Sequence, residues 1–312
     1  MTHGIPASAP VRAHAALIGL GSMGYGMGQS LLRAGLDVTG YDVNAASLAR
    51  FRSEGGATAD SPAEAARDAA IVVSVVVNAA QTEAILFGPG GVAETMREGA
   101  VFVSCATMDP EKARTFAARL EASGRHYLDA PISGGAQRAA LGELTMLASG
   151  SPAAVAAAKP ALEAMASKFY LLDEAAGIGA AFKMVNQLLA GVHIAAACEA
   201  MTFAARHGLD LPKVYEVITA SAGNSWMFEN RMPHVLDGDY RPRSAVNIFV
   251  KDLGIIQDMA RDARFPVPIS AAALQMFLAT SAAGMGEEDD ASVARLYARI
   301  TGTPLPGEPT SP

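Results

Sequence analysis

The sequence predicts an α/β fold with a doubly wound parallel sheet in its first half and an all-helical arrangement in its second half. Up to residue 176, short β-branched runs alternate with Ala-rich segments of helical pattern, which is typical of a parallel sheet covered by helices on both faces. After residue 176 the β-branched runs stop and helix-compatible sequence takes over. A chain of 312 residues is long enough for about two domains, each with its own apolar core.

The first half contains apolar, β-branched runs that we expect to form buried strands. They lie at residues 16–18, 37–41, 71–77, 100–104 and 126–129. Helical patterns occupy the intervals at residues 24–34, 45–54, 83–87 and 110–122. This alternation predicts consecutive strand–helix–strand units in one sheet.

A long helix is predicted for residues 180–207, which contain no proline and one glycine. A helix of about 28 residues is roughly 42 Å long at 1.5 Å per residue, enough to join two domains. The segment is Ala-rich and apolar on more than one face, so it has more apolar surface than one small domain covers. We therefore expect a homodimer or a homotetramer.

Proline-containing segments at both ends of the chain are predicted to be tails, over residues 1–14 and 303–312. Between them we expect a nucleotide-binding domain at residues 15–176 and an all-helical domain for substrate binding and oligomerisation at residues 177–302. The N-terminal tail lacks the apolar stretch of a secretory signal. The apolar run at residues 71–77 is too short to cross a bilayer, so we expect a cytoplasmic protein with no membrane partner.

Charge and cysteine content exclude two further classes. There are 24 lysines and arginines against 31 aspartates and glutamates, and the net charge of −7 has the wrong sign for coating a nucleic acid backbone. Cys105 and Cys198 lie inside apolar runs with no second Cys or His at metal-ligand spacing. We expect buried free thiols in a reducing compartment, with no disulfide and no metal site.

A glycine-rich loop with the spacing G-x-G-x-x-G follows the first predicted strand and opens a helix. Its glycines permit a tight turn and a close backbone approach, and the helix N-terminus offers unpaired N–H groups to a pyrophosphate. The loop therefore predicts a dinucleotide site in a Rossmann domain. The residues expected to contact the cofactor are Gly19, Leu20, Gly21, Ser22, Met23 and Gly24.

Asp42 ends the second predicted strand, 18 residues beyond Gly24. A carboxylate at this place accepts hydrogen bonds from an adenosine ribose and repels a 2′-phosphate, so NAD is favoured over NADP. Arg50 and Arg52 in the next helix would soften that preference. The alternative is a glycine turn accompanied by an unrelated surface aspartate.

Two further segments carry a resemblance to a known family. They read Asp-Ala-Pro-Ile-Ser-Gly-Gly at residues 129–135 and Gly-Ile-Gly-Ala-Ala-Phe-Lys-Met-Val-Asn-Gln at residues 177–187. With the glycine loop and Lys-Asp-Leu-Gly at residues 251–254, the chain resembles the β-hydroxyacid dehydrogenase family over nearly its whole length. Within the family, residues 183–193 and 223–231 and the pair at 289–290 most resemble the L-threonate dehydrogenases.

The resemblance implies that Lys183 is the catalytic acid and base. During oxidation such a lysine takes the hydroxyl proton of the substrate while a hydride leaves for the nicotinamide, and in reduction it returns the proton. Desolvation beside the substrate should lower its pKa. Gln187 lies at i+4 on the same helical face and Asn186 at i+3 is adjacent, so both are expected to bind substrate. A solvated surface lysine is the alternative.

Ser133, Gly134 and Gly135 form a small-residue loop whose hydroxyl and backbone N–H groups are suited to holding a substrate carboxylate. An ordinary turn is the alternative. Gln187 stands where many members of the family carry Asn, and its amide reaches one methylene further. This is compatible with a polyhydroxylated acid.

The resemblance also implies cofactor contacts outside the glycine loop. Thr107 would touch the cofactor near the nicotinamide ribose, and Val77 and Asn78 occupy a strand end where many relatives have Leu-Pro. Lys251 would approach the nicotinamide from the helical domain, with Asp252 pairing with it. An ordinary surface charge pair is the alternative for these last two residues.

The activity that the resemblance implies is the NAD-dependent oxidation of a small hydroxy acid, in the first place L-threonate to 2-oxotetronate. One alternative is a 3-hydroxyisobutyrate dehydrogenase or a tartronate semialdehyde (2-hydroxy-3-oxopropanoate) reductase. Another is a dinucleotide-binding scaffold without catalysis, and the presence of Lys183 argues against it.

Overall fold

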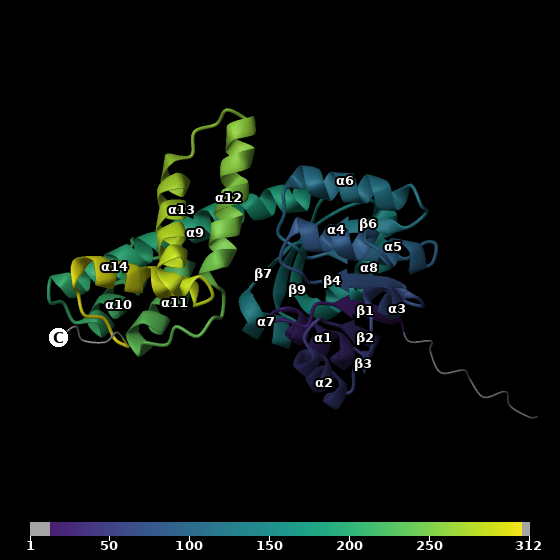
Figure 1. Cartoon of the computed structure of the whole chain (residues 1–312), viewed down its shortest axis with the longest axis horizontal. Helices are drawn as coiled ribbons and strands as arrows, with labels where there is room; N and C mark the ends of the chain where they lie inside the picture. The colour runs from purple at the N-terminus through teal and green to yellow at the C-terminus, as the bar shows by residue number, and fades with distance from the viewer. Residues whose placement is uncertain (1–12, 308–312) are drawn as a thin grey trace, which may run out of the picture. The chain divides into compact units, whose positions relative to one another are not determined.

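The structure is a computed structural model that describes residues 13–307 of the chain (Figure 1). It divides into two compact units, one ending at Ala181 and the other beginning at Phe182. Helix α9 (Ile178–Arg206) starts in the first unit and continues through the second.

The first unit is built on one sheet with the strand order β3-β2-β1-β4-β5-β6-β8-β7, and β9 pairs with β8. The strands are β1 (His14–Ile18), β2 (Asp37–Tyr41), β3 (Ala57–Thr58), β4 (Ile71–Ser74), β5 (Val101–Ser104), β6 (His126–Asp129), β7 (Ile132–Ser133), β8 (Leu144–Ser149) and β9 (Ala166–Asp173). The strands from β3 to β6 are parallel, so the doubly wound Rossmann sheet is confirmed. Beyond β6 the sheet is mixed, because β8 is antiparallel to both β6 and β7.

Successive side chains of the central strands face opposite sides of the sheet, because the strand repeat is two residues. Val73 and Val103 belong to one apolar core, whereas Val72 and Phe102 belong to another. Each of the two cores is completed by helices. These are α1 (Gly24–Arg33) and α8 (Pro152–Met165) on one side, and α3 (Pro62–Ala66), α4 (Ala79–Phe87), α5 (Val92–Thr95) and α6 (Pro110–Glu121) on the other.

The order of the strands creates a reversal between β1 and β4. Strand β1 pairs with β2 on one side and with β4 on the other, and Ile18 lies opposite both Tyr41 and Ser74. The three strands therefore end level, and the loops that follow them meet at one edge of the sheet. In open α/β sheets this is the edge where ligands bind.

Capping side chains determine where two helices begin, one at the expected residue and one earlier. Helix α2 (Ala45–Ser53) begins after Asn44, whose side chain accepts a hydrogen bond from the Ala46 N–H group. Helix α4 begins at residue 79 and not at 83, because the Asn78 side chain caps it by accepting from the Gln81 N–H group. The short helix α7 (Gly135–Leu141) and the strands beyond β6 are further elements that were not anticipated.

The second unit is all helical in the described residues, as the loss of β-branched runs predicts. After α9 it contains α10 (Leu211–Thr219), α11 (Trp226–Asp237), α12 (Val246–Asp262), α13 (Pro268–Thr280) and α14 (Val293–Thr301). Its apolar core includes Ile194, Met201, Met232, Phe249 and Phe277, all of them buried.

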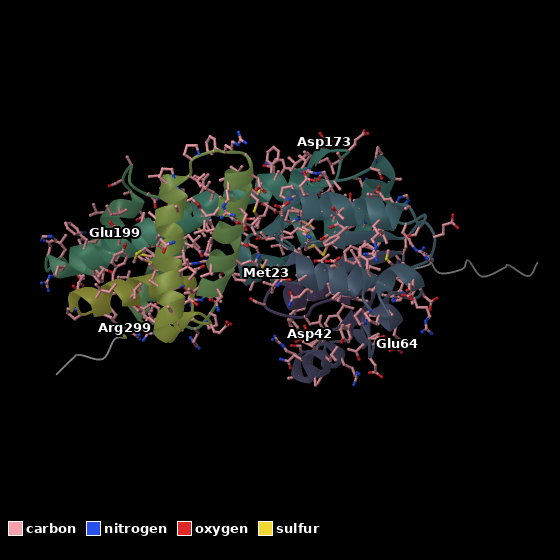
Figure 2. All side chains as sticks on the ribbon, turned by 45° about the horizontal axis from the view of Figure 1, so that its top comes forward. Met23, Asp42, Glu64, Asp173, Glu199 and Arg299 are labelled. Atoms are coloured by element: carbon pink, nitrogen blue, oxygen red, sulfur yellow. The ribbon has the colours of Figure 1, made fainter. Side chains whose placement is uncertain are left out.

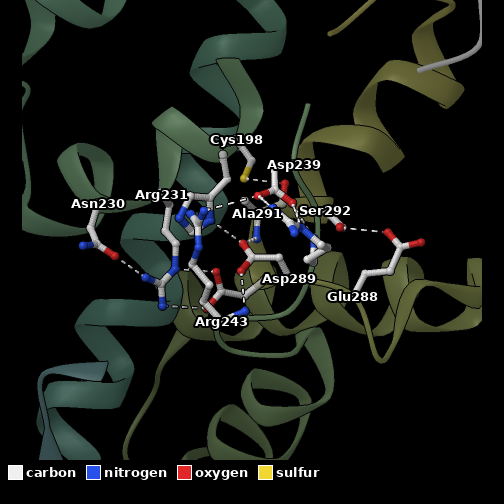
Figure 3. A network of polar contacts seen from close by, with 12 residues as sticks. Cys198, Asn230, Arg231, Asp239, Arg243, Glu288, Asp289, Ala291 and Ser292 are labelled. Atoms are coloured by element: carbon white, nitrogen blue, oxygen red, sulfur yellow. Dashed lines mark hydrogen bonds and ion pairs between the residues drawn. The ribbon is translucent and has the colours of Figure 1, made fainter. Parts of the chain in front are cut away.

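A buried polar network lies within this core (Figure 3). Arg231 donates two hydrogen bonds to Asp290, at 2.6 and 3.1 Å. Asp289 is bonded to His234 Nδ1 at 2.8 Å and also accepts from the backbone N–H group of Arg243. The Asp-Asp pair at 289–290 is therefore satisfied by groups from α11 and the loop after it, which is how buried carboxylates are accommodated.

The tails require two corrections. His14 is already part of β1, and Thr303 and Leu305 are buried, so the folded part extends beyond the expected range of 15–302 at both ends. The remainder of the expected tails, residues 1–12 and 308–312, lies outside the described residues.

Two segments of the described chain are long and apolar enough to span a bilayer by length and composition, α9 and residues 268–285. Half of the apolar window of α9 is buried inside the protein, as in a core helix.

Candidate active site

The glycine loop between β1 and α1 lies at the edge where β1, β2 and β4 end. A side chain on Gly19, which has a φ of +97°, would overlap the Val75 carbonyl oxygen, and a side chain on Gly24 would overlap the carbonyl oxygen of Gly19. Gly21 faces open space instead. Helix α1 has no side-chain cap, so its first N–H groups are not satisfied in that way. The loop thus offers backbone donors and room for a pyrophosphate.

Asp42 lies directly beyond β2 and is tied to the glycine loop. Its carboxylate accepts hydrogen bonds from the backbone N–H groups of Leu20, at 2.6 Å, and Asn44, at 2.7 Å. Figure 2 labels Asp42 and Met23, the last residue before α1. Each carboxylate oxygen has a second lone pair, so the group retains acceptors for a ribose while it holds the loop in place.

A cavity of about 400 Å³ borders the loop and is lined in part by Ser22, Tyr25 and Arg50. The Arg50 guanidinium lies 3.8 Å from the centre of the Tyr25 ring. This stacking keeps Arg50 against α1. The glycine loop, with Asp42 bonded beside it, fits a dinucleotide.

Other expected cofactor residues lie at the same ends of the parallel strands. Val77 and Asn78 follow β4, and Thr107 follows β5. Val77 is half exposed and its N–H group donates to Gln81 at 2.8 Å, while the Asn78 side chain caps α4. Asn78 is therefore engaged within its own loop, whereas the Val77 side chain is exposed at this edge.

The small-residue loop spans the end of β7 and the start of α7. Ser133 pairs with Thr145 of β8, and Gly134 adopts a φ of +138° at the N-cap of α7, where no side chain caps the helix. Gly135 follows with a φ of +78° and is exposed. The hydroxyl and two backbone N–H groups are thus gathered in one short segment.

Lys183 lies on α9 and is buried, with only 7% of its surface exposed. Burial lowers its pKa to about 8, against an opposing effect of the Asp252 carboxylate, which raises the pKa. The charge of Lys251 also contributes to this lowered pKa. Since a general base works best when its pKa is near the working pH, this lysine is suited to proton transfer.

A chain of polar contacts connects residues of α9 with α12. Gln187 donates to a carboxylate oxygen of Asp252 at 2.6 Å, and Asn186 donates to the Gln187 oxygen at 2.9 Å. Lys251 forms an ion pair with the other oxygen of Asp252. An ionised carboxylate accepts but does not donate, so Asp252 dictates that the Gln187 nitrogen points toward it and the Gln187 oxygen toward Asn186.

The amino terminus of α9 is held by two buried side chains of the sheet. Asp129 accepts hydrogen bonds from the N–H groups of Gly177, at 3.1 Å, and Ala180, at 2.8 Å. Ser149, which lies opposite Asp129 in the antiparallel pair β6–β8, accepts from the Gly179 N–H group at 2.8 Å.

Comparison with known proteins identifies the family of the chain. Residues 14–173 match the family model of the NAD binding domain of 6-phosphogluconate dehydrogenase. Residues 177–297 match the model described as NAD-binding of NADP-dependent 3-hydroxyisobutyrate dehydrogenase. The chain belongs to the β-hydroxyacid dehydrogenase family. Like other β-hydroxyacid dehydrogenases, it is an NAD-dependent oxidoreductase that acts on CH–OH groups.

Similar β-hydroxyacid dehydrogenases cover nearly the whole chain. L-Threonate dehydrogenase of Cupriavidus necator is 52% identical over 94% of this chain and 97% of its own length. Mitochondrial 3-hydroxyisobutyrate dehydrogenase of Mus musculus is 29% identical over 88% of this chain and 84% of its own. A crystal structure described as 3-hydroxyisobutyrate dehydrogenase from Salmonella typhimurium is 50% identical with a TM-score of 0.87, and covers 91% of this chain and 99% of that one.

The structure brings some of the expected residues of this β-hydroxyacid dehydrogenase together in two groups. The glycine loop and Asp42 form one group in the first unit, and Lys183, Asn186, Gln187 and Lys251 form the other in the second unit. Sequence reasoning missed the link from Gln187 to Asp252 and the contacts of Asp129 and Ser149 with α9. The Asp-Ala-Pro segment at a strand end signals Asp129, whereas nothing in the sequence singles out Ser149.

Proposed function

We propose that this enzyme oxidises L-threonate to 2-oxotetronate with NAD, and that Lys183 is the general base. One observation carries the choice of substrate. Five bacterial relatives that are 45–52% identical over at least 92% of this chain are named L-threonate dehydrogenase. An acid with four carbons and several hydroxyl groups also suits the polar amides of Asn186 and Gln187.

In the proposed reaction, neutral Lys183 accepts the proton of the substrate hydroxyl at its Nζ atom. Bound NAD supplies the acceptor for the hydride that leaves the same carbon. The Ser133 hydroxyl and the N–H groups of Gly134 and Gly135 hold the substrate carboxylate. Asn186 and Gln187, oriented by Asp252, contact the remaining hydroxyl groups, and Lys183 returns its proton when the reaction runs as a reduction.

The proposed cofactor site consists of the glycine loop, Asp42, Val77, Asn78 and Thr107, with Lys251 added from α12. Support comes from the backbone donors at the start of α1 and from the position of Asp42 beside Leu20. We also propose that residues 15–176 form the NAD-binding domain, and that residues 177–302 bind substrate and make the contacts of a homodimer or homotetramer. The enzyme is proposed to be soluble and cytoplasmic.

The test is a spectrophotometric NADH assay of the whole chain against a panel of three-carbon and four-carbon hydroxy acids, run with the wild type and Lys183→Ala. We expect L-threonate to give the highest kcat/KM. General acid–base catalysis contributes about 10²–10⁴-fold, so the variant should lose at least about a hundredfold in kcat with NAD affinity retained. Equal turnover by the variant would refute the role of Lys183.

A second candidate is 3-hydroxyisobutyrate dehydrogenase activity, favoured by the description of the similar Salmonella typhimurium structure. The same panel of hydroxy acids distinguishes the L-threonate dehydrogenase from the 3-hydroxyisobutyrate dehydrogenase activity. Fast turnover of 3-hydroxyisobutyrate without turnover of any aldonic acid would establish this second candidate and exclude L-threonate.

A further inference from the structure

We infer that Asp129 and Ser149 are positioning residues for Lys183, because together they hold the first turn of the helix that carries it. The inference rests on the proposed role of Lys183 as general base. Neither side chain is assigned a contact with substrate or cofactor; both act through the backbone of α9.

The contacts are specific and buried. Asp129 and Ser149 are completely buried, and their oxygens accept from the N–H groups of Gly177, Gly179 and Ala180. The first N–H groups of a helix have no partner within the helix, so these bonds determine where the helix starts and how its first turn is rotated.

The sequence of the turn is adapted to this contact. A side chain on Gly179 would overlap the carbonyl oxygen of Leu147 and would approach the Asp129 carboxylate at 3.1 Å. Gly177 has a φ of +92°, in the left-handed region that favours glycine. The helix therefore begins in close contact with the ends of β6 and β8, which only a Gly-x-Gly sequence permits.

Lys183 follows Gly179 by four residues, which is one turn of the same helix. A rotation or shift of the first turn therefore moves the Lys183 amine directly. A displacement of about 1 Å is enough to lower a rate by about a hundredfold when reacting groups must be aligned. This is the physical route from the two sheet residues to the reaction.

The charge of Asp129 should make its hold on α9 depend on pH. One carboxylate oxygen receives the bonds from α9 and the other has no hydrogen-bond partner among the described residues. Burial raises the pKa of Asp129 to about 6, against the hydrogen bonds from Ala180, Gly177 and Ser149 and the more distant Arg114 guanidinium, which lower it. Tyr127 and Cys105 are the other titratable groups that interact with this carboxylate, and burial keeps both neutral near pH 6 by raising their pKa.

Protonation of Asp129 replaces charge-assisted bonds to the helix by weaker neutral ones. For the wild type we expect kcat/KM for oxidation to rise with pH through about 8, as Lys183 becomes neutral, with an additional step of about tenfold centred near pH 6. Asp129→Asn keeps an acceptor for the helix and cannot ionise. Its profile should lack the step near pH 6, retain the rise through 8, and lie about tenfold lower on the alkaline side.

The experiment compares Asp129→Asn, Asp129→Ala and Ser149→Ala with the control Ser74→Ala. Ser74 is a serine at the end of β4 that is equally buried and whose hydroxyl has no hydrogen-bond partner in the described chain. We measure pH profiles of kcat and KM, NAD binding by calorimetry, and hydrogen exchange of a peptide spanning residues 177–183. Asp129→Ala and Ser149→Ala should exchange faster in that peptide and lose kcat, while NAD binding and the Ser74 variant stay at wild-type values.

Two results would overturn the inference. One is faster exchange at residues 177–183 with unchanged kcat, which would make the contact purely structural. The other is a step near pH 6 that persists in Asp129→Asn. If Asp129→Ala fails to fold, Asp129→Asn and Ser149→Ala decide the question. Failure of the proposed function is separable, because it appears as full turnover by Lys183→Ala whatever the Asp129 variants do.

Discussion

Lys183, the proposed general base, is buried at a cost in stability. Its folded-state pKa is about 8, below the ordinary value of 10.5, so the unfolded chain binds more protons between these two pH values. Stability therefore rises with pH across that window, and below pH 8 the buried charge lowers it by up to about 3 kcal/mol.

We expect Lys183→Met, which is similar in volume and uncharged, to increase the free energy of unfolding at pH 7 by about 1–3 kcal/mol while abolishing turnover. The gain should shrink as the pH approaches 10.5. Urea unfolding of both proteins at several pH values measures it. A variant less stable than the wild type at pH 7 would contradict the burial cost.

Asp252 is the residue whose charge organises the polar chain on α9 and α12. In Asp252→Asn the amide can both donate and accept, so Gln187 no longer has a single orientation and Lys251 loses its ion partner. The carboxylate also raises the pKa of Lys183, so its removal should move the alkaline midpoint of kcat/KM below 8.

We expect Asp252→Asn to raise the KM for the acid substrate by about tenfold, the usual cost of one lost charged hydrogen bond, in addition to the shift of the midpoint. Asp258→Asn is the matched control, because Asp258 is an exposed acid on the same helix whose partner is Arg261. An unchanged midpoint in Asp252→Asn would rule out the electrostatic link to Lys183.

At the scale of elements, two helical glycines predict opposite effects on stability. A side chain on Gly179 at the start of α9 overlaps the Leu147 carbonyl oxygen, whereas one on Gly254 within α12 meets no atom within 4 Å. We expect Gly179→Ala to destabilise the protein by about 2 kcal/mol or more, because packed backbone has to move. Gly254→Ala should stabilise it by about 0.5–1 kcal/mol through helix propensity. Thermal unfolding of the two variants without ligand measures both, and equal melting temperatures would refute the contact at Gly179.

The elements of the first half were predictable because each local pattern agrees with its place in the sheet. Strand β2 and the starts of α1, α2 and α6 coincide with the expectation, since β-branched runs, a glycine turn and capping residues all act locally. Strands β7, β8 and β9 were not predicted. They are stabilised by antiparallel or parallel pairing with distant residues, which leaves little local signal.

At the scale of the whole molecule, α9 exposes an apolar stripe in the described structure. Phe182, Val185 and Leu189 are spaced i, i+3 and i+7, and 49–64% of their surface is exposed. This spacing lies on one helical face, and such a stripe is suited to burial against a second copy. We expect Val185→Glu to reduce the molar mass in sedimentation equilibrium to that of a monomer. Ile300→Glu, at an equally exposed apolar residue on α14, should leave it unchanged. A monomeric wild type would contradict the proposed oligomer.

The sequence by itself determined the alternation of strands and helices in the Rossmann domain, the glycine loop with Asp42, the long helix and the lysine that it carries. These features depend on residue type and on spacing over a few residues, which the chain encodes locally. Only the tertiary structure decided that Asp252 orients Gln187 and that Asp129 and Ser149 hold the start of α9. Those partners are separated by 65, 51 and 30 residues, so folding has to bring them together before their charges and hydrogen bonds can act.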